Sequence, residues 1–332
     1  MAVDSTQIAA LVTDVGLTPM LAGYAAEPTV RDQVCQIRKI DPGGSERGWR
    51  DIVIVGDNRP SQIRYGQSAP ERTMQQGYTA IGRQRKLSQA MDIPEEIYKA
   101  PNARAVIEGM VTSTFGDWAQ GYQAEKESIA AAVFMRGCIA AGDTEVFNGT
   151  YEGATDSNVG FIGDGKPLFA ASGNGHPLYL KTSVTPYNLI ASNALSATTL
   201  DSTRVLISST NAVDDNNNPI VIMPNTLLVP PGLTTTAEVL TGSIQLPGGA
   251  NNDINVARGK YRVVTWRYIT DADGWFMGVA GKGVVFCDSG IPTFEVSAPD
   301  PRTGNIVIRM VSYCGAYARD WRYWFANNIA TS

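Results

Sequence analysis

The stretch from Pro101 to Gly142 constrains the fold most strongly, because its apolar residues recur at intervals of three and four. The repeating positions are Ile107, Val111, Phe115, Trp118, Tyr122, Ile129, Val133 and Arg136. This spacing predicts one long amphipathic helix that begins after an Ala-Pro-Asn sequence and ends at Gly142. Gly116 and Gly121 weaken its middle and favour a bend there. We interpret the aromatic stripe as core rather than as a cofactor-binding surface.

Alternation with a period of two precedes this helix, between Val34 and about Tyr78. Two such runs, Val34 to Arg38 and Ile52 to Val55, flank the turn-rich sequence DPGGSERG. The pattern predicts a long β-hairpin. Its strands are rich in Arg and Gln and offer little apolar surface, and a two-stranded ribbon is unstable alone in water. We therefore expect the hairpin to need a partner surface.

The first thirty residues are small, apolar and acidic, contain no Lys or Arg, and show no clear amphipathic register. Such a segment cannot build its own core, so we expect an arm that lies on the body of this chain or on a neighbouring subunit. It lacks the positive start of a secretory signal, and no apolar run in the sequence approaches the length of a bilayer span. These features predict a soluble protein made in the cytoplasm.

The region after the long helix predicts loops and then a small mixed domain. Residues 142 to 187 are rich in glycine, and loops of that length are usually functional or bound to a partner. A helix is predicted near Thr198 to Asn211, a strand at Asn225 to Val229, and a short helix to about Leu240. This alternation indicates a small mixed sheet.

The last seventy residues predict a set of strands. Tyr261 to Ile269 and Trp275 to Ala280 flank the turn sequence DADG, which predicts a hairpin. Further strands are expected at 284–287, 294–297 and 306–313. The aromatic sequence WRYWF at 321–325 indicates a packed terminus rather than a tail.

Few residues offer chemistry. His176, the single histidine, lies in GNGHPLY, and we interpret it as a loop residue hydrogen-bonded to backbone rather than a base or ligand. The stretch GDGKPLFAASGNG lacks the endings of a phosphate loop and of a dinucleotide fingerprint. Asp214, Asn216 and Asn218 begin a calcium-loop spacing, but Pro219 replaces the required glycine, so a surface turn is expected. We predict no catalytic, cofactor or metal site.

Charge and cysteine usage narrow the functional classes further. The four cysteines are scattered without a CxxC pair, which favours buried free thiols over a metal site or disulfides. From Arg31 to Arg104 there are 13 Lys or Arg against 9 Asp or Glu, a balance of +4, whereas the remainder has 14 against 23, or −9. Complementary patches of this kind can attract copies of the same chain, although a chance fluctuation fits equally well. For the basic cluster Arg83, Arg85 and Lys86, a salt-bridging face between subunits is favoured over nucleic-acid binding.

The order of these parts resembles the Hong Kong 97-type major capsid protein of tailed bacteriophages. Four stretches are also similar to the Mu-like head-subunit branch: KPLFAASGNGHPLYL at 166–180, NLIASNALSATTLDSTRVLI at 188–207, NTLLVPPGLTTTAEVL at 225–240 and YRVVTWRYITDADGWFMGVAGKGVVF at 261–286. The resemblance implies an α+β fold with an N-terminal arm at 1–32 and an extended E-loop hairpin at 33–80. It also implies a P-domain at 81–187 and 281–332, with a spine helix at about 102–141, and an A-domain at 188–280.

The resemblance implies a structural protein, not an enzyme, that self-assembles into hexamers and pentamers of an icosahedral shell enclosing double-stranded DNA. A portal and a possible decoration protein are implied as partners, DNA contact is expected to be non-specific, and the expected location is the virion. Because the sequence runs from Met1 directly into the arm, we expect a separate scaffolding protein. The candidate contacts with adjacent subunits are Arg38, Lys39, Arg47, Arg50, Arg64, Arg83, Arg85 and Lys86.

Two other functions stay open at this point. An encapsulin-like nanocompartment shell would have the same fold and would enclose cargo enzymes instead of a genome. A β-rich carbohydrate-binding or hydrolytic domain could share the Gly, Asn, Thr and Trp content. The absence of a secretory signal and of paired cysteines weighs against this last interpretation.

Overall fold

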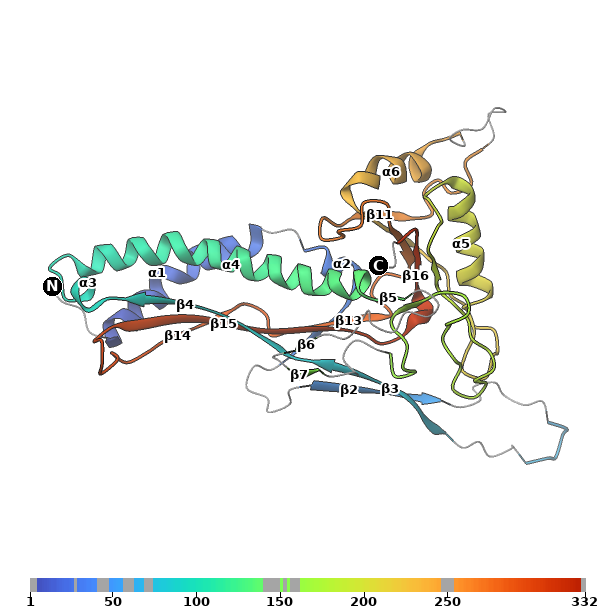
Figure 1. Ribbon diagram of the computed structural model, residues 1–332, viewed down its shortest axis with the longest axis horizontal. Coiled ribbons are helices and arrows are strands. Elements are labelled where there is room, and N and C mark those ends of the chain that lie inside the picture. Colours follow the sequence, from blue (N-terminus) through green and yellow to red (C-terminus); the bar gives the residue numbers. More distant parts are fainter. Residues whose placement is uncertain are drawn as a thin grey trace.

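The computed structural model describes residues 5–26, 29–40, 48–55, 63–68, 74–139, 150–151, 154–155, 162–245 and 254–329. The molecule is elongated and mixes helices with sheets (Figure 1). One long half consists of two long helices that run side by side in the same direction on a sheet, a second sheet with its own helices lies at the other end, and a ribbon of two strands extends away below. The fold is therefore α+β, as the resemblance implies.

The long helix is present as α4, Ala103–Met135, and it ends earlier than the predicted Gly142. Its apolar stripe is core, because Ile107, Val111 and Phe115 are fully buried. Arg136, which the spacing placed on the stripe, is the exposed C-cap residue. A short helix, α3 (Glu95–Tyr98), precedes α4.

The sheet beneath α4 is built around one long strand, β15 (Ile306–Ala318). On one side it pairs antiparallel with β4 (Arg85–Ile93), and on the other with β14 (Thr293–Val296) and β13 (Val284–Asp288). The strand β1 (Gln36–Lys39) pairs parallel with β13 at the edge. Ile93, Ile306 and Ile308 of this sheet pack with the first turns of α4 in one apolar cluster.

The arm is a helix, α1 (Ser5–Ala26), that lies along α4 of the same chain. Of the two surfaces that the sequence left open for it, the described residues of the arm lie on the body of their own chain. Glycines permit this close approach: a Cβ added at Gly23 would lie 2.0 Å from the carbonyl oxygen of Gly116, and one at Gly16 would lie 2.8 Å from the ring of Phe115. A one-turn helix, α2 (Arg31–Val34), connects the arm to β1.

The second sheet has the order β11-β10-β12-β16-β9. Its strands are β9 (Leu189–Ile190), β10 (Thr226–Val229), β11 (Arg262–Thr265), β12 (Trp275–Gly278) and β16 (Trp324–Asn327). The helices α5 (Ala197–Ser209) and α6 (Thr234–Gly242) pack on one face, and α6 follows the 3₁₀ turn η1 (Pro231–Leu233). The other face packs against the end of α4, where Phe134 contacts Trp266, Phe276 and Trp324 edge-on.

The predicted hairpin between Tyr261 and Ala280 is wrong. Strands form at both places, but β10 lies between them, parallel to β11 and antiparallel to β12. All four residues of β10 are buried, and a strand buried on both faces needs hydrogen-bonding partners on both edges. The turn at Asp271 is stabilised by local hydrogen bonds, because the Asp271 Oδ1 accepts from the backbone N–H groups of Asp273 and Gly274.

The first predicted hairpin has different strands from those expected. The run at Val34–Arg38 becomes β1 and pairs with β13, where it lies beside the buried Val285, Phe286 and Cys287. The ribbon is formed by β2 (Gly48–Val55) and β3 (Gln75–Arg83), which pair antiparallel with a β-bulge between Ile52 and Ile54. It extends away from the two sheets (Figure 1).

The remaining elements are short. They are β5 (Cys138–Ile139), which pairs with β8 (Phe169–Ala170), β6 (Thr150–Tyr151), which pairs with β7 (Ala154–Thr155), and the 3₁₀ turn η2 (Trp321–Tyr323). The helices predicted near 198–211 and before Leu240 are confirmed as α5 and α6, and the strand at 225–229 as β10. The strands expected at 284–287, 294–297 and 306–313 are confirmed as β13, β14 and β15.

We expect Gly23→Ala to lower the midpoint of thermal unfolding and to expose the arm to protease, because the new methyl group would push α1 away from the backbone of α4. Gly121→Ala is the matched control, since a Cβ at this glycine of α4 meets nothing within 4 Å. Alanine is about 1 kcal/mol more favourable than glycine inside a helix, so this control should be neutral or stabilising. Equal effects of the two substitutions would contradict the close-packing interpretation.

Candidate assembly site

The basic residues predicted to meet adjacent subunits lie at several places on the molecule. Lys39 at the end of β1, Arg64 in the distal part of the ribbon and Lys86 in β4 are exposed, and Arg85 is half-buried. Arg47 lies outside the described residues, and Arg50 and Arg83 belong to β2 and β3 without a described side chain. Their role as contacts between subunits stays a prediction.

Arg38 of β1 turns toward its own chain. Its Nη2 donates to Asp51 Oδ1 at 3.1 Å and its Nη1 donates to the hydroxyl of Tyr317 at 3.3 Å. The Arg38 side chain is nevertheless 40% exposed. Arg38 thus already has an anionic partner within the subunit.

The ribbon carries large apolar side chains that the sequence analysis missed. Ile52 is 54% exposed, Ile63 48% and Met74 76%, and Tyr65 is fully exposed. Aromatic and methionine side chains are enriched in the contact surfaces of protein complexes. The Arg and Gln residues of this segment did not point to them, and the useful signal was apolar residues in a hairpin with no core of its own.

A second set of exposed apolar side chains lies on the second sheet's domain. Val221, Met223, Ile244, Ile254 and Val256 are each more than half exposed. Ile254 and Val256 border a groove of about 410 Å³ between α5 and residues 254–261, with Leu200 and Tyr261 in its lining. Exposed apolar side chains that border a groove are typical of protein contact sites.

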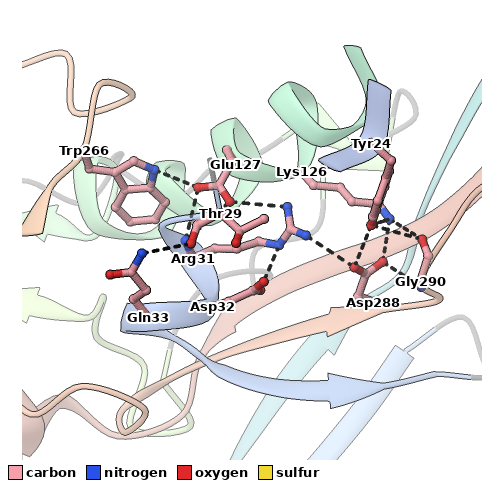
Figure 2. Close-up of polar contacts among 10 residues, drawn as sticks. All are labelled: Tyr24, Thr29, Arg31, Asp32, Gln33, Lys126, Glu127, Trp266, Asp288 and Gly290. Carbon is pink, nitrogen blue, oxygen red and sulfur yellow. Dashed lines mark hydrogen bonds and ion pairs between the residues drawn. The ribbon is translucent and has the colours of Figure 1, made fainter. Parts of the chain in front are cut away.

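A buried cluster of charges joins the segments of the chain (Figure 2). Lys126 and Glu127 of α4 are 0% and 1% exposed, and Arg31 of α2 is 2% exposed. The Lys126 Nζ donates to Asp288 Oδ1 at 2.6 Å, to the Gly290 carbonyl at 2.7 Å and to the Tyr24 hydroxyl at 3.0 Å.

Arg31 lies between the carboxylates of Glu127 and Asp288, and its Nε also lies 3.4 Å from Asp32 Oδ1 (Figure 2). Its guanidinium lies 3.4 Å from Glu127 and 3.6 Å from Asp288, and its backbone N–H donates to Glu127 Oε2 at 3.1 Å. The indole N–H of Trp266 donates to the same oxygen at 2.9 Å. The cluster, which we call the junction, therefore connects α1, α2, α4, the end of β13 and the second sheet.

Burial sets the protonation of the junction. It raises the pKa of the Glu127 carboxyl from 4.5 to about 7, against the opposing charge of Arg31 and the donors Arg31 N–H and Trp266. Burial also lowers the pKa of Lys126, which Asp288 opposes. Both shifts reflect the cost of removing a charge from water.

The glycine-rich segment at 142–187, which we call the connector, is held in its described part by a second buried polar cluster around His176. His176 is a loop residue, as predicted, but its ring contacts side chains rather than backbone: Nδ1 lies 2.8 Å from Asp164 Oδ2 and Nε2 lies 3.3 Å from Asn188 Oδ1. The ring stacks on Trp321 with centroids 4.7 Å apart. The Asn188 amide donates to the carbonyls of Leu168, Trp321 and Trp324. The histidine is therefore an internal support of the connector.

The other sequence candidates behave as structural groups. The Asp214 Oδ1 accepts from the backbone N–H groups of Asn216 and Asn218, which confirms the surface turn. Cys35, Cys287 and Cys314 are buried free thiols, as predicted. Within the described part of the chain, no group of three or more His, Cys, Asp or Glu side chains could hold a metal ion, and none of its helices combines the length and apolarity that a membrane crossing requires.

The family model described as phage capsid protein matches residues 109–327, about two thirds of the chain. The chain belongs to the phage capsid protein family, and it is a structural capsid protein. Membership of this family favours the capsid function over the carbohydrate-binding and hydrolytic functions. Membership of the Mu-like branch stays a prediction.

Comparison with solved structures gives weaker similarities. The capsid of the Cyanophage P-SCSP1u is 12% identical over 92% of this chain and 89% of that chain, with a TM-score of 0.48. The capsid of Ralstonia phage GP4 is 11% identical over 91% and 93%, with a TM-score of 0.48. The virus-like particle from Pyrococcus furiosus is 9% identical over 95% and 98%, with a TM-score of 0.43. No curated protein sequence matches the chain.

We expect the protein to lose stability as pH rises through about 7, because folded Glu127 keeps a proton that the unfolded chain releases above pH 4.5. This contribution is fully present below the unfolded value, and each pH unit between the two values lowers it by about 1.4 kcal/mol. The measurement is the free energy of unfolding by urea for the wild type and for Glu127→Gln, from pH 5 to 8. Relative to Glu127→Gln, the wild type should lose stability from pH 5 to about 7, and the difference should level off above that value.

Glu125→Gln is the control, because Glu125 is an exposed carboxylate of the same helix, two residues from Glu127. Its difference from the wild type should stay constant over the same range. A constant difference for Glu127→Gln as well would contradict a buried carboxyl that titrates near neutrality.

Proposed function

We propose that copies of this chain assemble into hexamers and pentamers of a closed icosahedral shell that encloses double-stranded DNA. The observation that carries this proposal is the projecting ribbon, together with the family. Tyr65, Met74 and Ile52 on the ribbon are large apolar side chains that are more than half exposed. A second copy that covers them would supply the buried area that a two-stranded ribbon lacks.

The contacts between copies combine this apolar surface with charge. Lys39, Arg64 and Lys86 are exposed basic residues in the part of the sequence with a balance of +4. The remainder carries a balance of −9, so opposite patches of adjacent copies attract and steer one another. Arg47, Arg50, Arg83 and Arg85 belong to the same proposed basic surface.

The proposal includes a location and partners. The shell subunit resides in the virion after synthesis in the host cytoplasm, with a separate scaffolding protein, a portal and a possible decoration protein as partners. Contact with the packaged DNA is non-specific, and the subunit has no catalytic role and no cofactor. An encapsulin-like shell is the second candidate, and the phage capsid family model favours the genome-enclosing shell.

The test is expression of the full chain with and without its neighbouring virion proteins, followed by electron microscopy and mass measurement of the particles. We expect closed shells, and nucleic acid rather than a protein cargo in particles isolated from infected cells. A stable monomer under all conditions would contradict the proposal, and protein cargo would favour the encapsulin-like alternative.

We expect Tyr65→Ser combined with Met74→Ser to reduce the yield of shells at least tenfold without changing the unfolding midpoint of the subunit, since both side chains are exposed. Aromatic side chains at the centre of a contact typically contribute about 2 kcal/mol or more to binding. The control is Val106→Ser, which removes an exposed apolar side chain from α4 instead. Normal shells from the double variant would exclude the ribbon tip as a contact.

A further inference from the structure

A compact polar bridge lies where the ribbon meets the body. Asp51 of β2 accepts a hydrogen bond from the Tyr317 hydroxyl at 2.6 Å and from Arg38 Nη2 at 3.1 Å. The Arg319 Nε lies 3.7 Å from its second oxygen. The Asp51 side chain is only 11% exposed, and Tyr317 is buried. Three strands, β1, β2 and β15, thus meet at one carboxylate.

The electrostatics agree with a formed bridge. Burial alone would raise the pKa of Asp51, but the hydrogen bonds from Tyr317 and Arg38 and the charges of Arg38 and Arg319 hold it below its ordinary value. The carboxylate is therefore ionised at neutral pH and forms charge-assisted hydrogen bonds, which are stronger than neutral ones.

Close packing holds the second strand of the ribbon at the same place. A Cβ added at Gly82 of β3 would lie 2.4 Å from the Tyr317 ring, and one at Gly163 of the connector would lie 2.4 Å from the backbone of Thr79. Ala80 of β3 is buried with Tyr317, Val285 and Cys287. The Tyr78 ring meets the Tyr179 ring edge-on at 5.0 Å. The connector and β15 therefore both pack against residues 78–82 of β3, which we call the root of the ribbon.

The distal part of the ribbon is different. The bulge between Ile52 and Ile54 follows Asp51 directly, and bulges bend a strand and increase its twist. Beyond it, Val55 is still buried, whereas residues 63–68, Met74 and Gln75 are exposed. The root is thus fixed by the body, while the described residues of the tip are open to solvent.

We propose that the bridge of Asp51, Tyr317 and Arg38 is a positioning site that sets the direction in which the ribbon leaves the body, so that its tip meets an adjacent copy. This rests on the proposed function. The paired strands from Gly82 to Gln75 span roughly 23 Å at about 3.3 Å per residue, so a tilt of about 10° at the root displaces the far end by about 4 Å. Such a displacement exceeds what a complementary contact between proteins tolerates.

The decisive variant is Tyr317→Phe, which keeps the ring packed on Gly82 and removes the hydroxyl. Asp51→Asn is the second variant and keeps the size of the side chain. Both should retain the fold, with small decreases in the unfolding midpoint, and both should reduce the yield of regular closed shells at least tenfold. The double variant should be no worse than either single one, because both act on the same bond.

The matched control is Tyr122→Phe. Tyr122 of α4 is buried, and its hydroxyl donates to the Met310 carbonyl at 2.6 Å, so this variant removes an equally short hydrogen bond away from the ribbon. It should lower the midpoint by a similar amount and assemble normally. Equal assembly defects in Tyr122→Phe and Tyr317→Phe would overturn the positioning role, as would normal shells from both Tyr317→Phe and Asp51→Asn.

Hydrogen exchange of the unassembled subunit provides a readout that does not depend on shells. In Tyr317→Phe and Asp51→Asn, the amides of β2 and β3 should exchange at least tenfold faster, while those of β4 and β14 keep their protection. Unchanged exchange in β2 and β3 would contradict the claim that the bridge holds the ribbon in place. Faster exchange together with a wild type that never assembles would contradict the proposed function and leave the role of the bridge in holding the ribbon supported.

Discussion

The buried junction at the end of α4 is the contact on which the arrangement of the chain depends. Arg31, Lys126, Glu127 and Asp288 come from three separate parts of the sequence, and each is paired inside the protein. Removing one partner of a buried ion pair leaves an uncompensated charge, which costs about 3 to 5 kcal/mol. The junction therefore favours one specific arrangement of the arm, the long helix and the sheet over other apolar packings.

The arm and the ribbon solve the same physical problem in different ways. Neither can form a core of its own, and no sequence pattern distinguishes the surface that covers the arm from the one that covers the ribbon. The arm has Gly16 and Gly23, which let α1 approach α4 until backbone meets backbone. The ribbon packs at its root, through Ala80, the contact of Gly82 with Tyr317 and the buried Val55. Its tip remains the surface that another copy can cover.

Local pattern predicted what is local in this fold. The spacing of Ile107, Val111 and Phe115 identified α4, because helical periodicity depends only on neighbouring residues. Strand pairing was wrong twice, since β1 pairs with β13 and β11 with β10 across long stretches of sequence. Turn residues indicate hairpins between neighbouring strands and carry no information about strands that pair across long stretches of sequence. Single-residue roles such as the side-chain contacts of His176 depend on these pairings and were out of reach for the same reason.

The junction left a signal in the sequence that could have been found. Lys126 stands four residues after Tyr122 and three before Ile129, so a charged residue lies on the predicted apolar stripe. A cation on a buried face needs an anion from another element, and Asp288 at the end of β13 provides it.

The ribbon has a root that the body holds and a tip that is exposed. Because the root is already fixed, less conformational entropy is lost when the tip contacts another copy. A subunit with a rigid interior and one exposed, pre-oriented projection gains most from meeting its own copies.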